Sequence, residues 1–345
     1  MSRPRIVGLG TAQPDTRYTQ TELYAHSPWE PTPLLDRLFL ESSVQSRGLF
    51  VPPSWYSTPR TLSETNAAWR DGALQLGGRA LLRALDEADR PADQVDHFGV
   101  TTVTGYTTPG LDLLLAKEHG LRSDIARLHF NNIGCHAAVP LLRAATEHVV
   151  AHPDHLAVAL AVEVCSACFA EDDDPQNLVA LSLFGDGAAA AVISSAPTAS
   201  GPELLGFGSQ YAFEHMDALG FELGAQGFRI VLDPSIPGHI AHAIDGTVRA
   251  LLERHDLAPS DVEHWCFHPG GARILDAAQR ALGLSDLQLR SSRRVLRSAG
   301  NMSSPSVLFA LQEELQNRTP ARGSHGVMAA FGPGLGIEVA LLRFS

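Results

Sequence analysis

Ile133-Gly134-Cys135-His136-Ala137-Ala138 places a cysteine directly after a glycine, between a predicted strand and a predicted helix. Residues 126–132 have the pattern of a strand, and residues 137–148 carry apolar side chains at helical spacing. Backbone N–H groups and the helix dipole at such a junction favour the thiolate form of a cysteine. The segment therefore indicates a nucleophile at Cys135, with a buried structural cysteine as the alternative.

Two later segments carry polar residues in turns that precede predicted helices. In Phe267-His268-Pro269-Gly270-Gly271 a predicted strand ends at His268, and the glycines let a thin substrate arm pass close to the backbone. In Gly300-Asn301-Met302-Ser303-Ser304 the asparagine precedes a helix, where by itself it could be an N-cap or a turn residue. A thiolate, an imidazole and an amide donor together can attack an acyl carbonyl and stabilise an oxyanion.

Predicted strands and helices alternate along most of the chain. The strands lie near 5–9, 96–103, 126–132, 156–164, 187–194, 263–268, 326–331 and 337–343, and the helices at 67–88, 110–119, 137–151, 236–255, 272–283 and 305–316. This alternation predicts an α/β protein with covered sheets. The Ser-, Ala- and Pro-rich residues 194–202 mark a junction between two halves, and the Pro-rich residues 11–65 are predicted to be irregular.

Composition excludes several classes of protein. The 345 residues carry a formal net charge of −12, which argues against nucleic acid as a partner because phosphate binding needs a basic face. No apolar run approaches the ~18 residues of a membrane span. The first residues lack the apolar segment of a signal peptide. We therefore expect a cytoplasmic protein with no membrane or nucleic-acid partner.

The four cysteines are Cys135, Cys165, Cys168 and Cys266. Cys165 and Cys168 form a C-x-x-C pair, which could be a redox pair or half of a zinc site. The sequence has no second ligand pair at zinc spacing. We expect four reduced thiols, no metal and no cofactor.

Five motifs in one order resemble those of the type III polyketide synthases of the chalcone synthase superfamily, which have the thiolase fold. They are Gly134-Cys135, Leu183-Phe184-Gly185-Asp186-Gly187-Ala188-Ala189, His268-Pro269-Gly270-Gly271, Gly300-Asn301-Met302-Ser303-Ser304 and Phe331-Gly332-Pro333-Gly334-Leu335. The resemblance runs from about residue 5 to the C-terminus. It implies a five-layered αβαβα fold built from two similar halves, residues 1–195 with Cys135 and residues 196–345 with His268 and Asn301.

The same resemblance implies a decarboxylative Claisen condensation. Cys135, paired with His268 as thiolate and imidazolium, would carry an acyl starter. His268 and Asn301 would stabilise the enolate formed when a malonyl thioester loses CO₂. A pyrone, a resorcinol or a polyhydroxylated aromatic would result. Two alternatives stay open, a carrier-protein-dependent ketosynthase that joins acyl chains without iteration, and an inactive partner subunit, against which the intact trio argues.

Further site residues also follow from the resemblance. Phe184 and Phe228 would be gatekeepers between tunnel and cavity, and Cys168 would line the acyl cavity. Thr108 would reach the neighbour's cavity across a homodimer interface. The remaining predicted substrate-binding residues are Gly270 and Gly271 beside the pantetheine arm, Pro333 and Gly334 in a loop near the cyclisation end, and Arg47.

The donor's carrier group is the last question that the sequence raises. Arg47 is the basic residue left in Glu41–Arg47, where plant members have a basic cluster for the nucleotide of coenzyme A. A carrier-protein thioester is therefore an alternative to malonyl-CoA and acyl-CoA. Arg290, Arg293, Arg294 and Arg297 form a cluster that could dock coenzyme A phosphates or a carrier protein, or could be a solvated basic loop.

Overall fold

The structure, a computed structural model, describes residues 3–27, 29–169, 174–225 and 227–345. Its main sheet has the strand order β11-β12-β13-β8-β1-β7-β6-β4-β5, and its two parts join where Arg5 of β1 pairs with Glu203 of β8. The strands are β1 (Arg5–Ala12), β4 (His97–Thr102), β5 (Ala126–Asn131), β6 (Leu156–Val164), β7 (Asp186–Ser194), β8 (Glu203–Tyr211), β11 (Val262–Phe267), β12 (His325–Gly332) and β13 (Gly336–Arg343). Most pairs are antiparallel; β4 pairs in parallel with β5 and β6, and β11 with β12.

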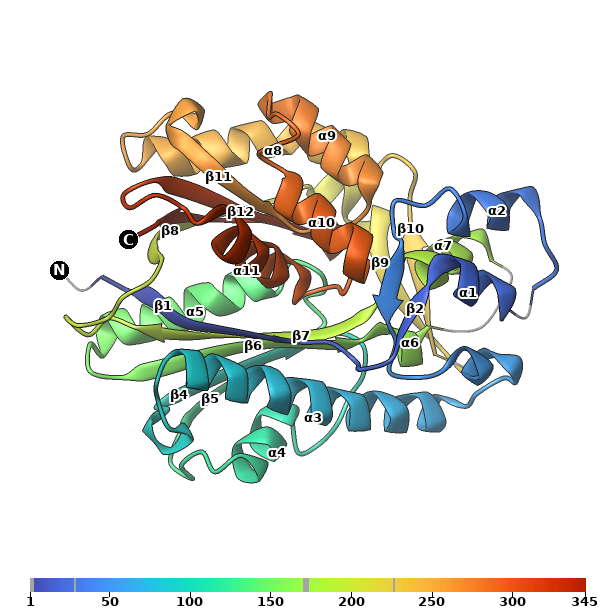
Figure 1. Ribbon diagram of the computed structural model, residues 1–345, viewed down its shortest axis with the longest axis horizontal. Coiled ribbons are helices and arrows are strands. Elements are labelled where there is room, and N and C mark those ends of the chain that lie inside the picture. The colour runs from blue at the N-terminus through green and yellow to red at the C-terminus, as the bar shows by residue number, and fades with distance from the viewer. Residues whose placement is uncertain (1–2, 28, 170–173, 226) are drawn as a thin grey trace.

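The helices complete five layers, as the sequence predicts (Figure 1). Helices α3 (Leu62–Glu87) and α4 (Leu111–Glu118) cover one outer face, and α8 (Ile236–Glu253) and α9 (Ala272–Leu282) cover the other. Between the two parts of the sheet lie α5 (Ala138–Ala151) and α11 (Ser306–Arg318), which contact strands of both parts. The order αβαβα places the N-terminus of α5, where Cys135 lies, inside the molecule.

Side-chain size alternates along the strands that flank the central helices. In β6, Ala157, Ala159 and Ala161 belong to the central core, whereas the larger Val158, Leu160 and Val162 face α3. Successive residues of a strand point to opposite faces, so this alternation gives the sheet one thin and one thick side. The alanine side lets α5 and α11 pack close to the sheet, because it leaves little side-chain volume between them.

Smaller elements surround the site and include the regions that sequence reasoning misjudged. They are β2 (Arg17–Thr19), α1 (Gln20–Ala25), α2 (Pro33–Phe39), β3 (Ser46–Gly48), α6 (Cys165–Cys168), α7 (Pro175–Leu183), β9 (Leu219–Gly224), β10 (Gly227–Leu232) and α10 (Arg290–Ala299). Residues 11–65 are thus only partly irregular. The arginine cluster of residues 290–297, for which a solvated basic loop was one alternative, lies in the helix α10, which buries Ser291, Val295 and Ala299 on one face. No helix in the described ranges has the length and apolar character to cross a membrane.

Candidate active site

Cys135 lies in a tight turn between β5 and α5, and a glycine makes that turn possible. Gly134 has φ +90°, a backbone conformation that side chains disfavour. A Cβ atom there would lie 2.5 Å from Cδ of Pro333, so the turn packs directly on the loop after β12. The Gly134 carbonyl accepts a 2.9 Å hydrogen bond from the Ala137 N–H at the start of the helix. Cys135 itself is buried.

His268 follows the last residue of β11 and is held by the neighbouring strand. Its backbone N–H donates to the Ala329 carbonyl of β12 at 2.8 Å, which extends the parallel pairing by one residue. The next turn folds back, because the Gly270 N–H donates to the His268 carbonyl at 2.9 Å. The imidazole is buried and lies 3.3 Å from where a Gly270 Cβ would be. The glycine therefore leaves room for the ring.

Asn301 is the point where the two halves of the site meet. Its backbone N–H donates to the Leu183 carbonyl at 3.0 Å, and its carbonyl accepts from the Gly185 N–H at 2.9 Å. The side-chain Oδ1 accepts from the Ser303 N–H at 2.8 Å, and Nδ2 lies 3.4 Å from the Gly270 carbonyl. Because Oδ1 is occupied, the amide presents its N–H donors toward the segment that carries His268.

A contact at the nucleophile connects the Cys135 turn with the Asn301 segment. Ser303, two residues after Asn301, places its hydroxyl 3.4 Å from the Cys135 sulfur. The Cys135 turn, the His268–Gly271 turn and the Asn301–Ser303 segment are therefore joined by direct contacts, as the sequence predicts for these segments. The individual roles of the three residues remain predictions.

Burial opposes the ionisation of both the nucleophile and the imidazole. It raises the pKa of the Cys135 thiol to about 12, an effect that the Ser303 hydroxyl partly offsets and Glu163 strengthens. Burial also lowers the pKa of His268 to about 3, with a smaller contribution from His136. The preformed thiolate–imidazolium pair expected from the sequence is thus opposed by desolvation.

A small apolar cluster surrounds the nucleophile. Its buried members are Cys135, Cys165, Cys168, Phe169, Ala180, Phe184 and Ile230, and Phe228 packs against it partly buried. Phe184 also forms an isolated β-bridge with Asn301, which pairs the backbones of these two residues. Cys168 and Phe184 therefore lie in the cluster that surrounds the nucleophile, and their cavity and gatekeeper roles remain predictions. Thr108 is exposed, and its hydroxyl bonds that of Tyr106 at 2.8 Å.

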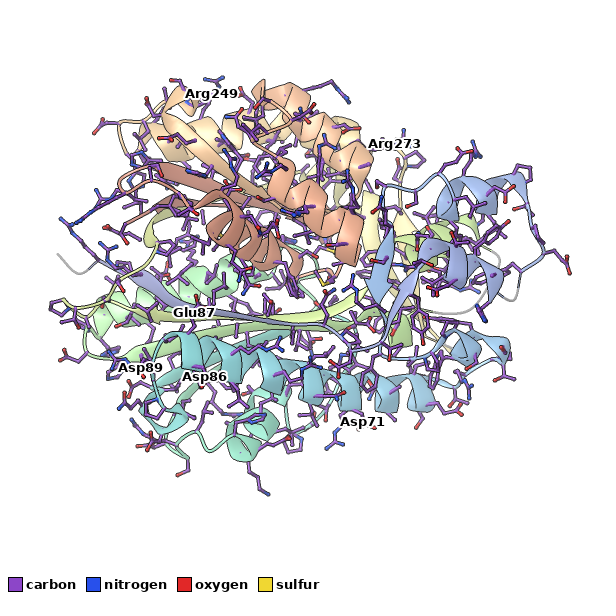
Figure 2. The ribbon with its side chains drawn as sticks, viewed as in Figure 1. Asp71, Asp86, Glu87, Asp89, Arg249 and Arg273 are labelled. Atoms are coloured by element: carbon purple, nitrogen blue, oxygen red, sulfur yellow. The ribbon has the colours of Figure 1, made fainter. Side chains whose placement is uncertain are left out.

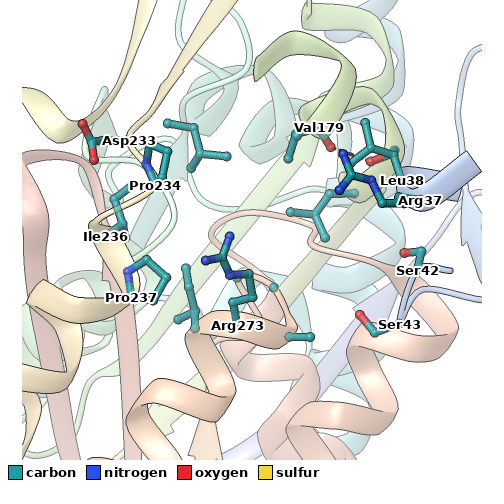
Figure 3. Close-up of a pocket in the computed structure, with 17 residues that line it drawn as sticks. Arg37, Leu38, Ser42, Ser43, Val179, Asp233, Pro234, Ile236, Pro237 and Arg273 are labelled. Atoms are coloured by element: carbon teal, nitrogen blue, oxygen red, sulfur yellow. Dashed lines mark hydrogen bonds between the residues drawn. The ribbon is translucent and has the colours of Figure 1, made fainter. Parts of the chain in front are cut away.

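A cavity of about 370 Å³ lies beside the turn that follows His268 (Figure 3). Gly270 and Gly271 line it, together with residues of α2, α7, α9 and the start of α8. Arg37 of α2 and Arg273 of α9 reach it from different elements, and both are exposed. Among the described residues neither guanidinium has a carboxylate partner within 4 Å. This cavity can therefore hold an anionic group.

The structure corrects the expectation about Arg47 and places two arginines of the α10 cluster in ion pairs. Arg47 is only 1% exposed, so it cannot meet a nucleotide phosphate at the surface, and its guanidinium bonds protein carbonyls instead. In the α10 cluster, Arg293 pairs with Asp276 at 2.7 Å and Arg294 with Glu313 at 2.8 Å. Each of these two cations has a carboxylate partner in the protein, and the docking role of the cluster remains a prediction. Arg37 and Arg273, which have no carboxylate partner within 4 Å among the described residues, lie at the cavity.

Sequence reasoning missed three residues around the nucleophile. Ser303 belongs to the motif Gly300–Ser304, but the motif alone assigns it no role. Glu163 is buried at the end of β6 and accepts hydrogen bonds from the Ser304 hydroxyl at 2.6 Å and the Val103 N–H at 2.9 Å. A lone carboxylate in an apolar strand was the available signal for it. His136 is buried beside Cys135; its Nδ1 has no hydrogen-bond partner among the described residues, and burial lowers its pKa to about 4.

Comparison with known proteins accounts for this arrangement. The family model for the N-terminal domain of chalcone and stilbene synthases matches residues 56–197, and that for their C-terminal domain matches residues 208–344. The chain is 37% identical to 1,3,6,8-tetrahydroxynaphthalene synthase of Streptomyces peucetius, over 98% of this chain and 93% of that relative. The chain belongs to the chalcone and stilbene synthase family.

Other relatives of this chalcone and stilbene synthase family member agree. It is 35% identical to 3,5-dihydroxyphenylacetyl-CoA synthase of Streptomyces toyocaensis, over 99% of this chain and 90% of the relative. It superposes with a TM-score of 0.92 on 1,3,6,8-tetrahydroxynaphthalene synthase of Streptomyces coelicolor, a bacterial type III polyketide synthase, at 26% identity over 100% and 99% of the two chains. The family member is a type III polyketide synthase, an acyltransferase with the thiolase-like fold that the sequence predicts.

Proposed function

We propose that this type III polyketide synthase loads an acyl starter on Cys135 and extends it with malonyl-CoA to a polyhydroxylated aromatic product. The observation that carries the proposal is the Cys135–Ser303 contact, which brings the nucleophile to the Asn301 segment. Gly270 and Gly271, which follow His268, line the cavity where we place the donor thioester. Every step of the cycle below uses side chains of this chain and the two thioesters.

Loading begins with the neutral thiol. As Cys135 attacks the starter thioester, its proton passes to His268, and the new thioester forms while the C–S bond to coenzyme A breaks. The released coenzyme A thiolate takes the proton from His268, so both groups return to their neutral forms. Burial disfavours an isolated charge on either residue, which supports a transfer in which the two charges appear and vanish together.

Extension begins with malonyl-CoA in the cavity beside Gly270. The bond to the carboxylate carbon breaks, CO₂ leaves, and its electron pair moves into the thioester as an enolate. The amide N–H of Asn301 and the imidazole of His268 would donate to the enolate oxygen. The enolate carbon then attacks the acyl carbon on Cys135, a C–C bond forms, and the cysteine sulfur leaves as a thiolate. This thiolate either attacks the new thioester for another round or takes up a proton from solvent. The orientation of the Asn301 amide as a donor supports this role.

The donor carrier that we propose is coenzyme A. Arg37 and Arg273 at the cavity can form charge-assisted hydrogen bonds with phosphates. Asp233 also lines the cavity, but its Oδ1 accepts two hydrogen bonds from Ser235. Figure 2 shows Asp71 and Asp86 of α3 on the side of the molecule opposite Arg273, so the acidic α3 face does not border this cavity. The net charge of −12 is therefore compatible with an anionic donor.

The product class rests on the relatives. The names of the two sequence relatives describe aromatic rings with several hydroxyl groups. We propose a product of this class here, and a homodimer in which Thr108 of each subunit approaches the other's cavity. The exposure of Thr108 supports this arrangement. All four cysteines are free and buried, which supports a reducing, cytoplasmic setting.

Product analysis tests the proposal. The purified enzyme is incubated with malonyl-CoA alone, with malonyl-CoA plus a panel of acyl-CoA starters, and with malonyl carrier protein, and products are identified by mass spectrometry. We expect polyhydroxylated aromatics from the coenzyme A reactions and one acyl adduct per chain, absent in Cys135→Ala. Turnover with carrier-protein donors alone would refute the donor assignment, and an adduct that persists in Cys135→Ala would refute the nucleophile.

A further inference from the structure

The C-terminus of α7 receives an unusual set of partners. This helix ends just before Phe184, and the last carbonyls of a helix have no partners within it. Each of the final three finds one elsewhere in the chain. Arg47 Nη1 donates to Leu181 O at 2.8 Å, Gln20 Nε2 donates to Ser182 O at 2.8 Å, and Asn301 N donates to Leu183 O at 3.0 Å. The end of α7 is therefore built from three distant segments.

Arg47 is the charged member of this set and holds more than one partner. Its Nη1 also donates to the Phe184 carbonyl at 2.5 Å, and its Nε donates to Gln20 Oε1 at 3.1 Å. The guanidinium thus bonds the carbonyls on both sides of the final turn and orients the Gln20 amide that caps Ser182. One planar cation with donors in a fixed fork can do this, and an ammonium cannot.

The stem of Arg47 reaches the Asn301 segment as well. A Cβ atom at Gly300 would lie 2.9 Å from Cδ of Arg47 and 2.6 Å from the Leu183 carbonyl. Gly300 has φ +70°, so the glycine is needed both for its backbone conformation and for the close approach. Arg47 therefore contacts Gly300, the residue before Asn301, and bonds the carbonyl of Phe184. Phe184 and Asn301 are themselves joined by an isolated β-bridge.

This arginine is costly to bury. It is 1% exposed, and in the part of the chain that the structure describes no carboxylate lies within 4 Å of it. Burial lowers its pKa to about 10, which still leaves it a cation at neutral pH. The negative end of the α7 dipole and the carbonyls offset part of the desolvation. An apolar side chain could fill this volume but would leave two carbonyls unpaired.

We propose that Arg47 is a positioning residue that sets the relative placement of Phe184 and Asn301, and through them the decarboxylation step. The inference rests on the proposed roles of Asn301 and Phe184. Arg47 does not line the cavity beside Gly270. Its removal should displace the amide donor while the Cys135 turn, which it does not contact, stays in place. Decarboxylation should therefore suffer more than acylation.

Two variants and a matched control separate this role from general stabilisation. Arg47→Met removes the donors and keeps an unbranched apolar side chain, whereas Arg47→Lys keeps the charge with one point of contact. Arg318→Met removes another poorly exposed arginine, which pairs with buried Glu314 at 3.1 Å in α11. For each, three quantities are measured: Cys135 acylation by intact mass, CO₂ release from malonyl-CoA, and the melting temperature.

We expect Arg47→Met to acylate Cys135 within about twofold of wild type while CO₂ release falls at least ~10-fold, a part of the loss seen when an oxyanion donor is removed. The CO₂ release of Arg47→Lys should lie between that of Arg47→Met and that of wild type. Arg318→Met should keep the wild-type ratio of CO₂ release to acylation. If Arg47→Met does not fold, the comparison of Arg47→Lys with Arg318→Met decides. An unchanged ratio in folded Arg47 variants would overturn the inference, whereas normal CO₂ release by Asn301→Ala would instead overturn the proposed function.

Discussion

The Ser303 hydroxyl lies 3.4 Å from the Cys135 sulfur, although 168 positions separate the two residues in the chain. The hydroxyl is the strongest of the influences that lower the pKa of a thiol which burial otherwise raises. Ser303 also stands two residues after Asn301, and its backbone N–H donates to the Asn301 Oδ1 and so orients that amide. One residue therefore connects the nucleophile with the proposed oxyanion donor.

Replacement of Ser303 by alanine should slow the reaction of Cys135 with iodoacetamide at pH 8. Loss of a hydrogen bond worth about 1 kcal/mol to the thiolate corresponds to a roughly fivefold smaller thiolate fraction. The rate is measured by intact mass over time. Ser298→Ala is the control, because that exposed hydroxyl bonds the Arg294 carbonyl within α10. Equal alkylation rates in wild type and Ser303→Ala would show that the contact has no influence on the thiol.

Replacement of Asn301 by alanine should separate acylation from decarboxylation. The variant keeps Cys135 and its turn, so a starter thioester should still form one adduct. Release of CO₂ from malonyl-CoA should fall by ~10²–10³, the usual cost of a lost oxyanion donor. Both rates are followed in parallel, one by intact mass and the other by labelled CO₂. Wild-type CO₂ release from the variant would refute the donor role.

His136 should make the fold sensitive to acid. Burial lowers its pKa from 6.5 to about 4. Between these two pH values the ring is protonated in the unfolded chain and neutral in the folded chain. The free energy of unfolding is therefore unaffected by this ring above pH 6.5 and decreases as the pH falls from 6.5 toward 4. His136→Phe removes this decline, which amounts to about 2 kcal/mol at pH 5.

The measurement compares urea unfolding of wild type and His136→Phe at pH 7.5 and pH 5. The difference between the two proteins is what counts, because Asp186, whose pKa burial raises to about 6, contributes with the opposite sign in both. We expect the free energy of unfolding of His136→Phe, relative to that of wild type, to be higher at pH 5 than at pH 7.5. A difference that does not change with pH would contradict a neutral buried His136.

The two arginines at the cavity should contribute to the binding of malonyl-CoA, whereas the paired arginines of α10 should not. Arg37→Gln with Arg273→Gln removes the two guanidinium groups that reach the cavity, and the KM for malonyl-CoA should rise roughly tenfold at low salt. Arg293→Gln with Arg294→Gln is the matched control, since these two are paired with Asp276 and Glu313. A larger effect from the α10 pair would reverse the assignment.

A homodimer is expected to be the active form. Light scattering at micromolar concentration should give twice the chain mass of 36.9 kDa. Thr108→Trp should then alter the product pattern or chain length without loss of Cys135 acylation, because a large ring would enter the neighbour's cavity. A monomeric mass for an active enzyme would refute the arrangement.

Sequence reasoning reached the features that depend on local pattern. The glycine turn before Cys135, the strand that ends at His268 and the alternation of strands with helices are visible in neighbouring residues, because periodicity and turn chemistry act over a few positions. The helix α10 escaped this reasoning, since its apolar face is small and its arginines dominate the segment. The five-layer order came from resemblance and not from the pattern itself.

By itself the sequence determined which residues stand at turns and which faces are apolar, because both are set by chemistry within one or two turns of backbone. Tertiary structure alone decided which distant groups meet. Arg47, expected at the surface, is buried under the end of α7, while Arg37 and Arg273, 236 positions apart, border one cavity. The shifts in the pKa of Cys135 and His268 were also decided there, since desolvation depends on everything packed around a group and not on its neighbours in the chain.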